Sequence, residues 1–230
     1  METGPATPLD RPAWSSLTGR QAELAIGRGG ALRMHPDFGL FVALADETPA
    51  SLAAAGELVR EHGPSGFVEP APPPPVPGTI VRSSALCWQM AARAITPLKP
   101  VEFEIVALTD ADAAEMLALA TLTKPGPFFS RTHELGAFVG VKVDGELAAM
   151  AGERMRPDGF TEVSGVCTGP GFRGKGYAAG LLAHVAGKIL ARGETPFLHS
   201  YADNAGANAL YQALGFERRA DIWFTVLAPQ

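Results

Sequence analysis

Apolar residues are spaced differently in the two halves of the chain. In the first half, short apolar stretches with helical or alternating spacing predict a compact unit that mixes helices and strands. The predicted elements are helical turns around Trp14, Leu17 and Leu24, a strand over residues 39–44, a helix over 51–60 and a strand over 79–82. This half has the side chains for a core but few residues that suggest chemistry.

The second half has a more regular pattern of strands and helices. Strands are predicted over residues 103–108, 137–143, 146–153, 161–168, 197–201 and 222–227, and helices over 111–122, 205–214 and a segment with Leu181, Leu182, Val185, Ala186, Ile189 and Leu190. Asp144 and Gly145 separate two apolar stretches and predict a tight hairpin, and Gly193 is placed to end the long helix. This order of elements predicts an α+β fold.

Prolines indicate where the chain divides. Six of them lie within residues 70–77 and favour a stiff, extended surface loop, with an SH3-type ligand as the alternative. Pro97 and Pro100 interrupt the chain again. We therefore predict an N-terminal accessory domain over residues 1–100, which includes the proline-rich loop, and a second domain over 101–230.

Composition narrows the classes of partner and compartment. The 230 residues carry a formal net charge of −5 and have no Lys/Arg cluster, which argues against nucleic acid as a partner. The two cysteines, Cys87 and Cys167, lie far apart and suggest a reducing compartment, and no metal-ligand spacing appears. Residues 1–12 lack the pattern of a signal peptide, and no apolar segment is long enough to cross a bilayer. We expect a cytoplasmic protein with no metal and no membrane partner.

The segment with the clearest chemistry is the loop of residues 173–178. Its sequence, Arg-Gly-Lys-Gly-Tyr-Ala, follows a predicted strand and begins a predicted helix. Two glycines let a ligand approach the backbone, and the first N–H groups of a helix have no partner within the helix. Arg173 and Lys175 add full positive charges to the helix dipole. This loop is suited to a pyrophosphate. Gly27-Arg28-Gly29-Gly30, in contrast, fits no nucleotide-binding spacing and is interpreted as a plain turn.

Two motifs in order resemble those of the GNAT acyltransferase superfamily. Arg173, Gly176 and Ala178 match the family's Arg/Gln-x-x-Gly-x-Gly/Ala loop, and residues 204–216, with Asn204 and Tyr211, resemble its second motif. The similarity covers residues 102–227 and looks closest to the C-terminal domains of glycine N-acyltransferases. It implies a GNAT fold with a mixed, mostly antiparallel sheet flanked by helices, and acetyl-CoA as the acyl donor. The first 100 residues would then form a smaller α/β domain, interpreted as a degenerate GNAT lobe that shapes the acceptor site.

The resemblance also implies a set of donor-binding residues. Gly165, inside a predicted strand, suggests a bulge that separates this strand from the one at 197–201 and frees backbone groups for the pantetheine amides of coenzyme A. The predicted donor-binding residues are Val166, Cys167, Thr168, Arg173, Gly174, Lys175, Gly176, Tyr177, Ala178, Asn204 and Asn208.

Glu162 is the candidate general base. Strand alternation would place Glu162, Ser164, Val166 and Thr168 on one face, toward the separated strands. Glu162 also precedes the loop by eleven residues, a spacing that resembles the base of the histone-acetylating members of the family. The alternatives are a salt-bridged structural glutamate with a water chain as base, or His199, which is also consistent with a core histidine.

Tyr211 is the candidate acid that assists the departing thiolate. Asn204, Asn208 and Tyr211 fall at i, i+4 and i+7 and so share one face of a helix. A phenol in a dry site stabilises a developing thiolate by donating a hydrogen bond without full proton transfer. A second chemical route, with Cys167 as an acylated intermediate, is weaker because alternation turns Cys167 away from Glu162 and no histidine is placed to ionise it.

The expected function is transfer of an acetyl group from acetyl-CoA to a primary amine by direct attack in a ternary complex. The sequence leaves the acceptor open between a small-molecule amine and a protein amine, and it is compatible with a homodimer. The loop with Phe128, Phe129, Arg131 and His133 is one candidate for the acceptor site. The alternative function is a non-catalytic acyl-CoA sensor or partner module.

Overall fold

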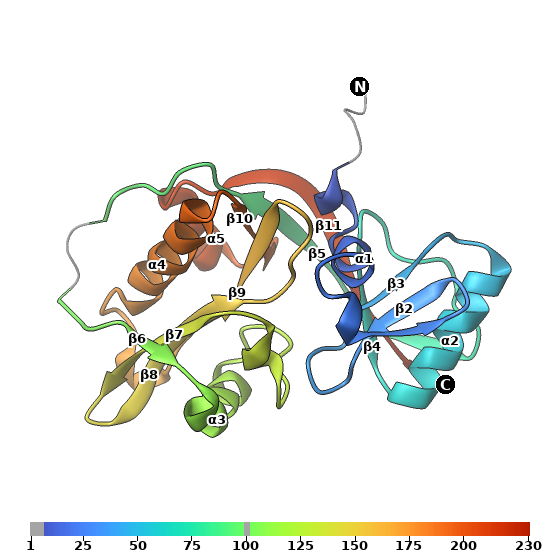
Figure 1. Cartoon of the computed structure of the whole chain (residues 1–230), viewed down its shortest axis with the longest axis horizontal. Helices are drawn as coiled ribbons and strands as arrows, with labels where there is room; N and C mark the ends of the chain where they lie inside the picture. The colour runs from blue at the N-terminus through green and yellow to red at the C-terminus, as the bar shows by residue number, and fades with distance from the viewer. Residues whose placement is uncertain (1–6, 99–101) are drawn as a thin grey trace.

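A computed structural model describes residues 7–98 and 102–230, so Pro100 and the predicted boundary between residues 100 and 101 lie outside the described residues. Two halves lie side by side and are joined by two long strands (Figure 1). The helices are α1 (Pro12–Thr18), α2 (Pro49–His62), α3 (Ala113–Thr123), α4 (Tyr177–Ala191) and α5 (Ala205–Ala213). The strands are β1 (Ala25–Arg28), β2 (Ala31–Met34), β3 (Val42–Leu44), β4 (Ser65–Glu69), β5 (Thr79–Ala91), β6 (Val106–Leu108), β7 (Phe138–Val143), β8 (Glu146–Glu153), β9 (Phe160–Thr168), β10 (Thr195–Tyr201) and β11 (Glu217–Pro229).

The central sheet has eight strands in the order β4-β11-β5-β10-β9-β8-β7-β6, and β1-β2-β3 form a second sheet. Within the central sheet, the described pairs are antiparallel except for β9 with β10. Helix α4 packs on one face of the β7 to β10 region and α3 packs on the face opposite, beside β8 and β9. The predicted architecture, a mixed, mostly antiparallel sheet flanked by helices, is confirmed.

Local sequence explains the main helices and the hairpin. Helix α2 begins after Thr48, whose side chain accepts a hydrogen bond from the backbone N–H of Ser51. The carboxylate of Asp46 accepts further hydrogen bonds from Thr48 and Ser51, so side chains of this chain already satisfy the start of α2. Gly193, with φ +78°, follows the end of α4 as predicted. Asp144 and Gly145 both have positive φ, which a two-residue turn of this kind requires.

Strand β5 crosses between the halves. The sequence predicts a strand only over residues 79–82, but β5 runs for 13 residues and lies between β11 and β10. Its first part is exposed, with Ile80 at 52% and Val81 at 63% of full exposure, so it lacks the alternation of a half-buried strand. The last strand, β11, lies in turn between β4 and β5. The two predicted domains therefore share one continuous sheet.

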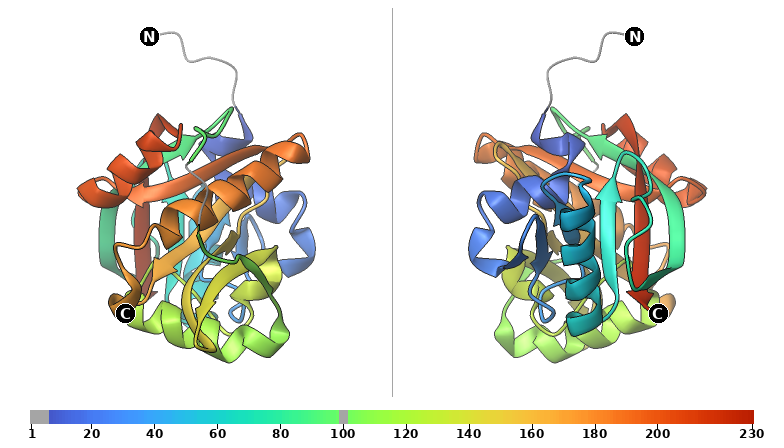
Figure 2. Two further views of the ribbon diagram at one scale, coloured as in Figure 1. Left: turned by 90° about the vertical axis from the view of Figure 1, so that its left-hand side faces the viewer. Right: turned by 90° about the vertical axis from the view of Figure 1, so that its right-hand side faces the viewer.

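The two halves have similar connectivity. In the C-terminal half, β7, β8 and β9 are followed by α4, then β10, α5 and β11. In the N-terminal half, β1, β2 and β3 are followed by α2, then β4 and β5. Phe41, directly before β3, forms one parallel bridge with Gly66 of β4, as β9 and β10 pair in parallel. Helix α4 packs on β7 to β10 of its own half, whereas α2 packs on strands of its own half and also on β11. Figure 2 shows the molecule from the sides of these two helices.

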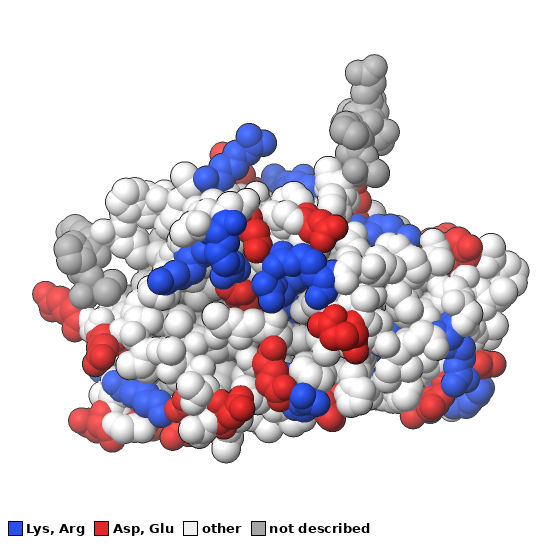
Figure 3. Space-filling view, viewed as in Figure 1, with Lys and Arg blue, Asp and Glu red and all other residues white. Residues whose placement is uncertain are grey.

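Charged residues of both signs are distributed over the surface. Figure 3 shows one face, on which basic side chains gather near the middle with acidic residues around them. In residues 7–98 and 102–230, no helix is long and apolar enough to cross a membrane.

Candidate active site

The candidate site lies where β9 and β10 separate. The two strands pair only from Thr195 with Phe160 to Phe197 with Glu162, and beyond that point their ladder ends. Two cavities open there. The first, here called the loop groove, has a volume of about 460 Å³ and is lined by residues 173–179 together with the end of β9. The second, the inner cleft, has about 100 Å³ and is lined by the middle of β9, by β10 and by residues from both halves. Both cavities share Pro125, Val166, Tyr201, Asn204 and Tyr211.

Gly165 forms the predicted bulge. Its φ is +64°, and the register between β8 and β9 shifts beside it. A Cβ atom at this position would lie 3.0 Å from the ring of Phe138, so glycine is favoured by space as well as by backbone conformation.

The bulge reverses which side chains face which layer. Val163 and Val166 both pack in the cluster under α4, although an unbroken strand would place residues i and i+3 on opposite faces. Cys167 pairs with Met150 and packs in the cluster under α3. The predictions that Val166 and Thr168 share the face of Glu162, and that Cys167 lies on the other face, are therefore wrong.

The loop of residues 173–178 has the geometry of an anion site. Gly174 and Gly176 both have φ +78°, which other residues adopt only with strain. Gly176 precedes α4 without any side-chain cap, so the first N–H groups of α4 remain available. Arg173 and Lys175 are exposed beside them, and the Lys175 ammonium lies 5.6 Å from the centre of the Phe172 ring. Tyr177 and Ala178 also line the loop groove, and Tyr177 packs edge-on against Phe103.

The remaining predicted donor-binding residues differ in position. Thr168 lines the loop groove, and its buried Oγ1 has no partner among the described residues, which suits a ligand hydrogen bond. Asn204 lines both cavities while its side chain caps α5 through the N–H of Ala207. Asn208 lines neither cavity. It is buried, and its Nδ2 donates to the carbonyls of Tyr201 and Ala202, so its role is to hold the turn between β10 and α5.

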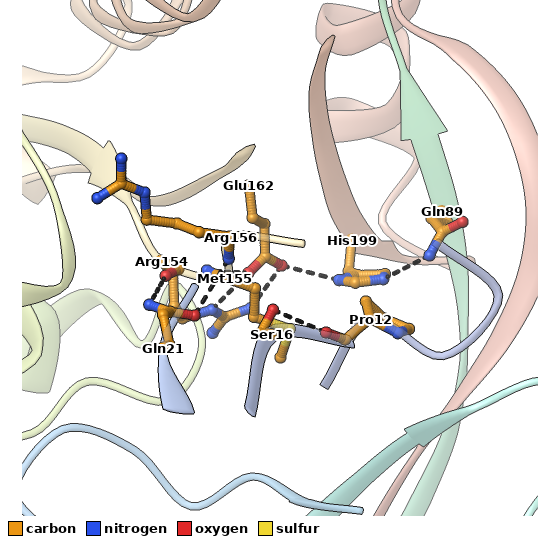
Figure 4. A network of polar contacts seen from close by, with 9 residues as sticks. All are labelled: Pro12, Ser16, Gln21, Gln89, Arg154, Met155, Arg156, Glu162 and His199. Atoms are coloured by element: carbon orange, nitrogen blue, oxygen red, sulfur yellow. Dashed lines mark hydrogen bonds and ion pairs between the residues drawn. The ribbon is translucent and has the colours of Figure 1, made fainter. Parts of the chain in front are cut away.

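Glu162 is fully buried and its carboxylate is saturated. Arg154 donates from Nε to Oε2 and from Nη2 to Oε1, each at 2.8 Å. His199 Nδ1 lies 2.8 Å from Oε1, and the Met155 N–H donates to Oε2 at 3.3 Å. Figure 4 shows the carboxylate pointing toward these groups.

These contacts change the interpretation of Glu162. Two carboxylate oxygens accept about four hydrogen bonds, so none remains for a substrate amine. Burial alone would raise the pKa of Glu162, but the charge of Arg154 and the hydrogen bonds from Arg154 and His199 lower it well below the usual range of a carboxyl group. Glu162 is thus a poor general base, and the salt-bridged alternative fits it better.

The neighbouring network engages both ring nitrogens of His199. Gln89, from β5, accepts a hydrogen bond from Arg219 at its Oε1, so its Nε2 donates to the carbonyl of Leu9 and faces His199 Nε2 at 3.2 Å. His199 Nε2 must then accept, and its Nδ1–H donates to Glu162. Both ring nitrogens of His199 are therefore in use, Nδ1 with Glu162 and Nε2 with Gln89 (Figure 4). Gln89 was missed because its contact with His199 crosses 110 residues of sequence.

Arg154 is the cationic group of the inner cleft, and the sequence analysis did not select it. Its guanidinium lies 4.7 Å from the centre of the Phe41 ring, and its backbone carbonyl accepts from Gln21. The sequence does contain an indication of Arg154: it is a charged residue directly after the predicted apolar strand 146–153 and eight residues before Glu162.

Tyr211 lies where the two cavities meet, as a donor to a leaving thiolate would require. Burial raises the pKa of its phenol, and burial is also the main cause that raises the pKa of Tyr201, which lines the same junction. Both hydroxyls are therefore protonated donors at neutral pH.

The loop with Phe128, Phe129, Arg131 and His133 does not line the inner cleft. Arg131 pairs with Glu134 and lies over the ring of Phe38, and His133 Nε2 lies 3.2 Å from the Asp110 carboxylate. Residues 125–127, just before this loop, line the inner cleft instead.

The two cysteines are buried and free. Burial raises the pKa of each thiol, that of Cys87 and that of Cys167, to about 11. The thiolate needed for an acylated intermediate is scarce at neutral pH, which disfavours that route.

Comparison with known proteins supports one family. The model of the FR47-like protein family matches residues 138–224. A crystal structure from Novosphingobium aromaticivorans, assigned to the GNAT family of acetyltransferases, is 46% identical with a TM-score of 0.91, and the match covers 98% of this chain and 100% of that one. A GCN5-related N-acetyltransferase from Kribbella flavida is 20% identical, with a TM-score of 0.63 over 95% of this chain and 94% of that one, and shares the fold. A search of the curated proteins finds no match.

Proposed function

The chain belongs to the GNAT family of acetyltransferases, and from that membership we propose that it transfers an acetyl group from acetyl-CoA to a primary amine. The observation that carries the proposal is the uncapped start of α4, flanked by Arg173 and Lys175, at the edge of the cavity that meets the inner cleft. Acetyl-CoA supplies the pyrophosphate for this loop and amide groups for the free edge of β9. The narrower similarity to glycine N-acyltransferase C-terminal domains is part of the same proposal.

The reaction proceeds by direct attack in a ternary complex. The neutral amine nitrogen attacks the thioester carbonyl, a C–N bond forms, the C–S bond breaks and the amine proton passes to water. Tyr211, at the junction of the cavities, donates a hydrogen bond to the departing thiolate sulfur. Glu162 stays ionised and fixes Arg154 and His199. The N-terminal half, as a degenerate GNAT lobe, closes the inner cleft with Phe41, Val68 and Cys87.

The double variant Arg173→Ala/Lys175→Ala should weaken acetyl-CoA binding by about 10- to 100-fold or more, because a hydrogen bond to a charged group contributes about 1.5–3 kcal/mol. Isothermal titration calorimetry measures the change. Lys188→Ala is the matched control, since it removes one exposed positive charge from the far end of α4 and should leave affinity within twofold. If the double variant also binds within twofold of the wild type, the donor assignment is wrong.

Tyr211→Phe should lower kcat by about 10²- to 10³-fold and leave the affinity for acetyl-CoA nearly unchanged, because the lost hydrogen bond acts on charge that develops in the transition state. Free thiol release measures kcat and calorimetry measures affinity. Tyr201→Phe is the comparison, since Tyr201 is the other phenol at the junction. A large loss with Tyr201→Phe and none with Tyr211→Phe would transfer the role to Tyr201. Donor binding without turnover of any amine would instead favour the sensor function.

A further inference from the structure

The inner cleft has six titratable residues in its lining: Cys87, Arg154, Glu162, His199, Tyr201 and Tyr211. The Glu162 carboxylate accepts all the hydrogen bonds it has room for, and His199 Nε2 is engaged by Gln89. Burial raises the pKa of Cys87 to about 11 and raises the pKa of both tyrosines, so these groups hold their protons. No side chain in this lining is free to accept a proton from an incoming ammonium group.

Among the described residues that line the cleft, none provides a free anion to hold an ammonium; the Asp203 carboxylate acts on Cys87 and Tyr201 from outside this lining. Its one lining carboxylate, Glu162, is paired with Arg154 at 2.8 Å. An acceptor that arrives charged would therefore lose hydration without gaining an ion pair. The acceptor nitrogen must be neutral before it enters.

That requirement separates amines by their basicity. At pH 7.5 a lysine-type amine with pKa near 10.4 is neutral in about one molecule in 800, whereas an α-amine with pKa near 7.8 is neutral in about one in three. The difference is about 250-fold in the concentration of the reactive form. In a site without a base of its own, the rate of acetyl transfer is proportional to the neutral fraction of the amine, so this factor appears in kcat/KM.

The walls of the cleft indicate the rest of the acceptor. Phe41 and Val68 from the N-terminal half line the cleft together with Ile222 and Phe224 from β11, so one part of the lining is apolar. Arg154 Nη1 is the one guanidinium nitrogen that is not bonded to Glu162, and a Cβ atom on Gly126 would lie 3.9 Å from it. The N–H groups of Nη1 suit an acceptor oxygen, and because the charge of Arg154 is already paired with Glu162, a neutral carbonyl oxygen fits this wall better than a second carboxylate.

We propose that the acceptor is a weakly basic α-amine next to a neutral carbonyl group, with an apolar side chain, as found in amino-acid amides and at the N-terminus of a peptide. This inference rests on the proposed acetyl transfer and names its substrate class. The apolar walls hold the side chain, Arg154 Nη1 binds the carbonyl oxygen, and the nitrogen faces the junction of the two cavities.

The experiment measures kcat/KM with acetyl-CoA by free thiol release for L-leucinamide and for the side-chain amine of Nα-acetyl-L-lysinamide. At pH 7.5 leucinamide should be preferred by at least 100-fold. The preference should shrink about 30-fold between pH 7.5 and 9.5, because the neutral fraction of the lysine amine rises steeply over that range while that of the α-amine is nearly complete. A ratio that stays constant with pH, or a lysine amine used within tenfold of leucinamide, overturns the proposal. A Leu-Gly-Gly peptide distinguishes the two sources: preference for it indicates a peptide N-terminus, and preference for leucinamide indicates a small amide.

A variant in the lining of the inner cleft tests whether the acceptor binds in this cavity. Val68→Phe should raise KM for leucinamide at least tenfold and leave acetyl-CoA affinity within twofold, which also shows that the variant is folded. An unchanged KM would place the acceptor elsewhere and overturn the proposal. The donor assignment is tested separately: if the wild type binds acetyl-CoA but acetylates neither α-amine, the acceptor class is wrong and the donor site stands, whereas absence of acetyl-CoA binding refutes the proposed function itself.

Discussion

Glu162→Leu should lower the free energy of unfolding by about 3–5 kcal/mol, whereas Glu162→Leu combined with Arg154→Met should cost considerably less. The single change leaves a buried guanidinium without its counter-charge, and an unpaired buried charge is strongly destabilising. The double change replaces both charges by apolar groups. Urea unfolding of the wild type, both single variants and the double variant gives the coupling free energy.

Two comparisons make this result specific. Glu134→Ala breaks the exposed pair with Arg131 and should have a much smaller effect, because water screens both groups. Since the pKa of Glu162 is lowered in the folded state, its ion pair stabilises the protein above the unfolded carboxyl pKa near 4.3 and loses that contribution as pH falls below it. The advantage of the wild type over Glu162→Leu should therefore stay constant from pH 7 to about pH 5 and decrease from there toward pH 3. Equal stability of Glu162→Leu and the wild type at pH 7 would contradict the buried pair.

A chain that begins at residue 101 should fail to fold, although it holds both family motifs. Without β5, the facing edges of β10 and β11 lose their shared neighbour, which pairs with β10 from Phe197 to Tyr201 and with β11 along nearly its whole length. Unpaired edges of this length also promote aggregation. We expect insoluble protein, and circular dichroism of any soluble fraction should show no cooperative thermal transition.

Co-expression provides the control for this prediction. Fragments 1–98 and 102–230 together contain every strand of the central sheet, so they should assemble into a soluble complex that binds acetyl-CoA. A soluble fragment 101–230 with a cooperative transition of its own would show that β5 is dispensable.

The sequence predicted those features that local rules determine. The Asp144-Gly145 hairpin, the Gly193 helix end and the bulge at Gly165 each follow from a backbone conformation that few residues adopt. The order of strands and helices after residue 102 follows from apolar spacing. The insertion of β5 beside β10 was not predictable in this way, because strand pairing over such a distance leaves no local pattern.

The choice between the two alternatives for Glu162, general base or salt-bridged glutamate, could not be made from the sequence for a related reason. Its position was found from strand spacing, but the ionisation of a buried carboxylate depends on neighbours that only the fold brings together, here Arg154 and His199. The bulge at Gly165 was predicted, yet its effect on alternation was not carried through, so the faces of Val166 and Cys167 were exchanged. Tyr211 and Asn204 line the same cavities because α5 carries Tyr211 and begins directly after Asn204, whereas the catalytic role of Tyr211 stays a prediction.

The start of α2 affects how many donor molecules one chain is expected to bind. Each half of the chain has a helix that begins after a strand, at the place where a neighbouring parallel strand diverges. At α4 that helix begins with glycine and open N–H groups, but at α2 Thr48 and the carboxylate of Asp46 already occupy the equivalent place. The chain thus carries a built-in anion where a second phosphate would bind. We therefore expect one molecule of the proposed donor per chain, while the N-terminal half contributes Phe41, Val68 and Cys87 to the wall of the inner cleft.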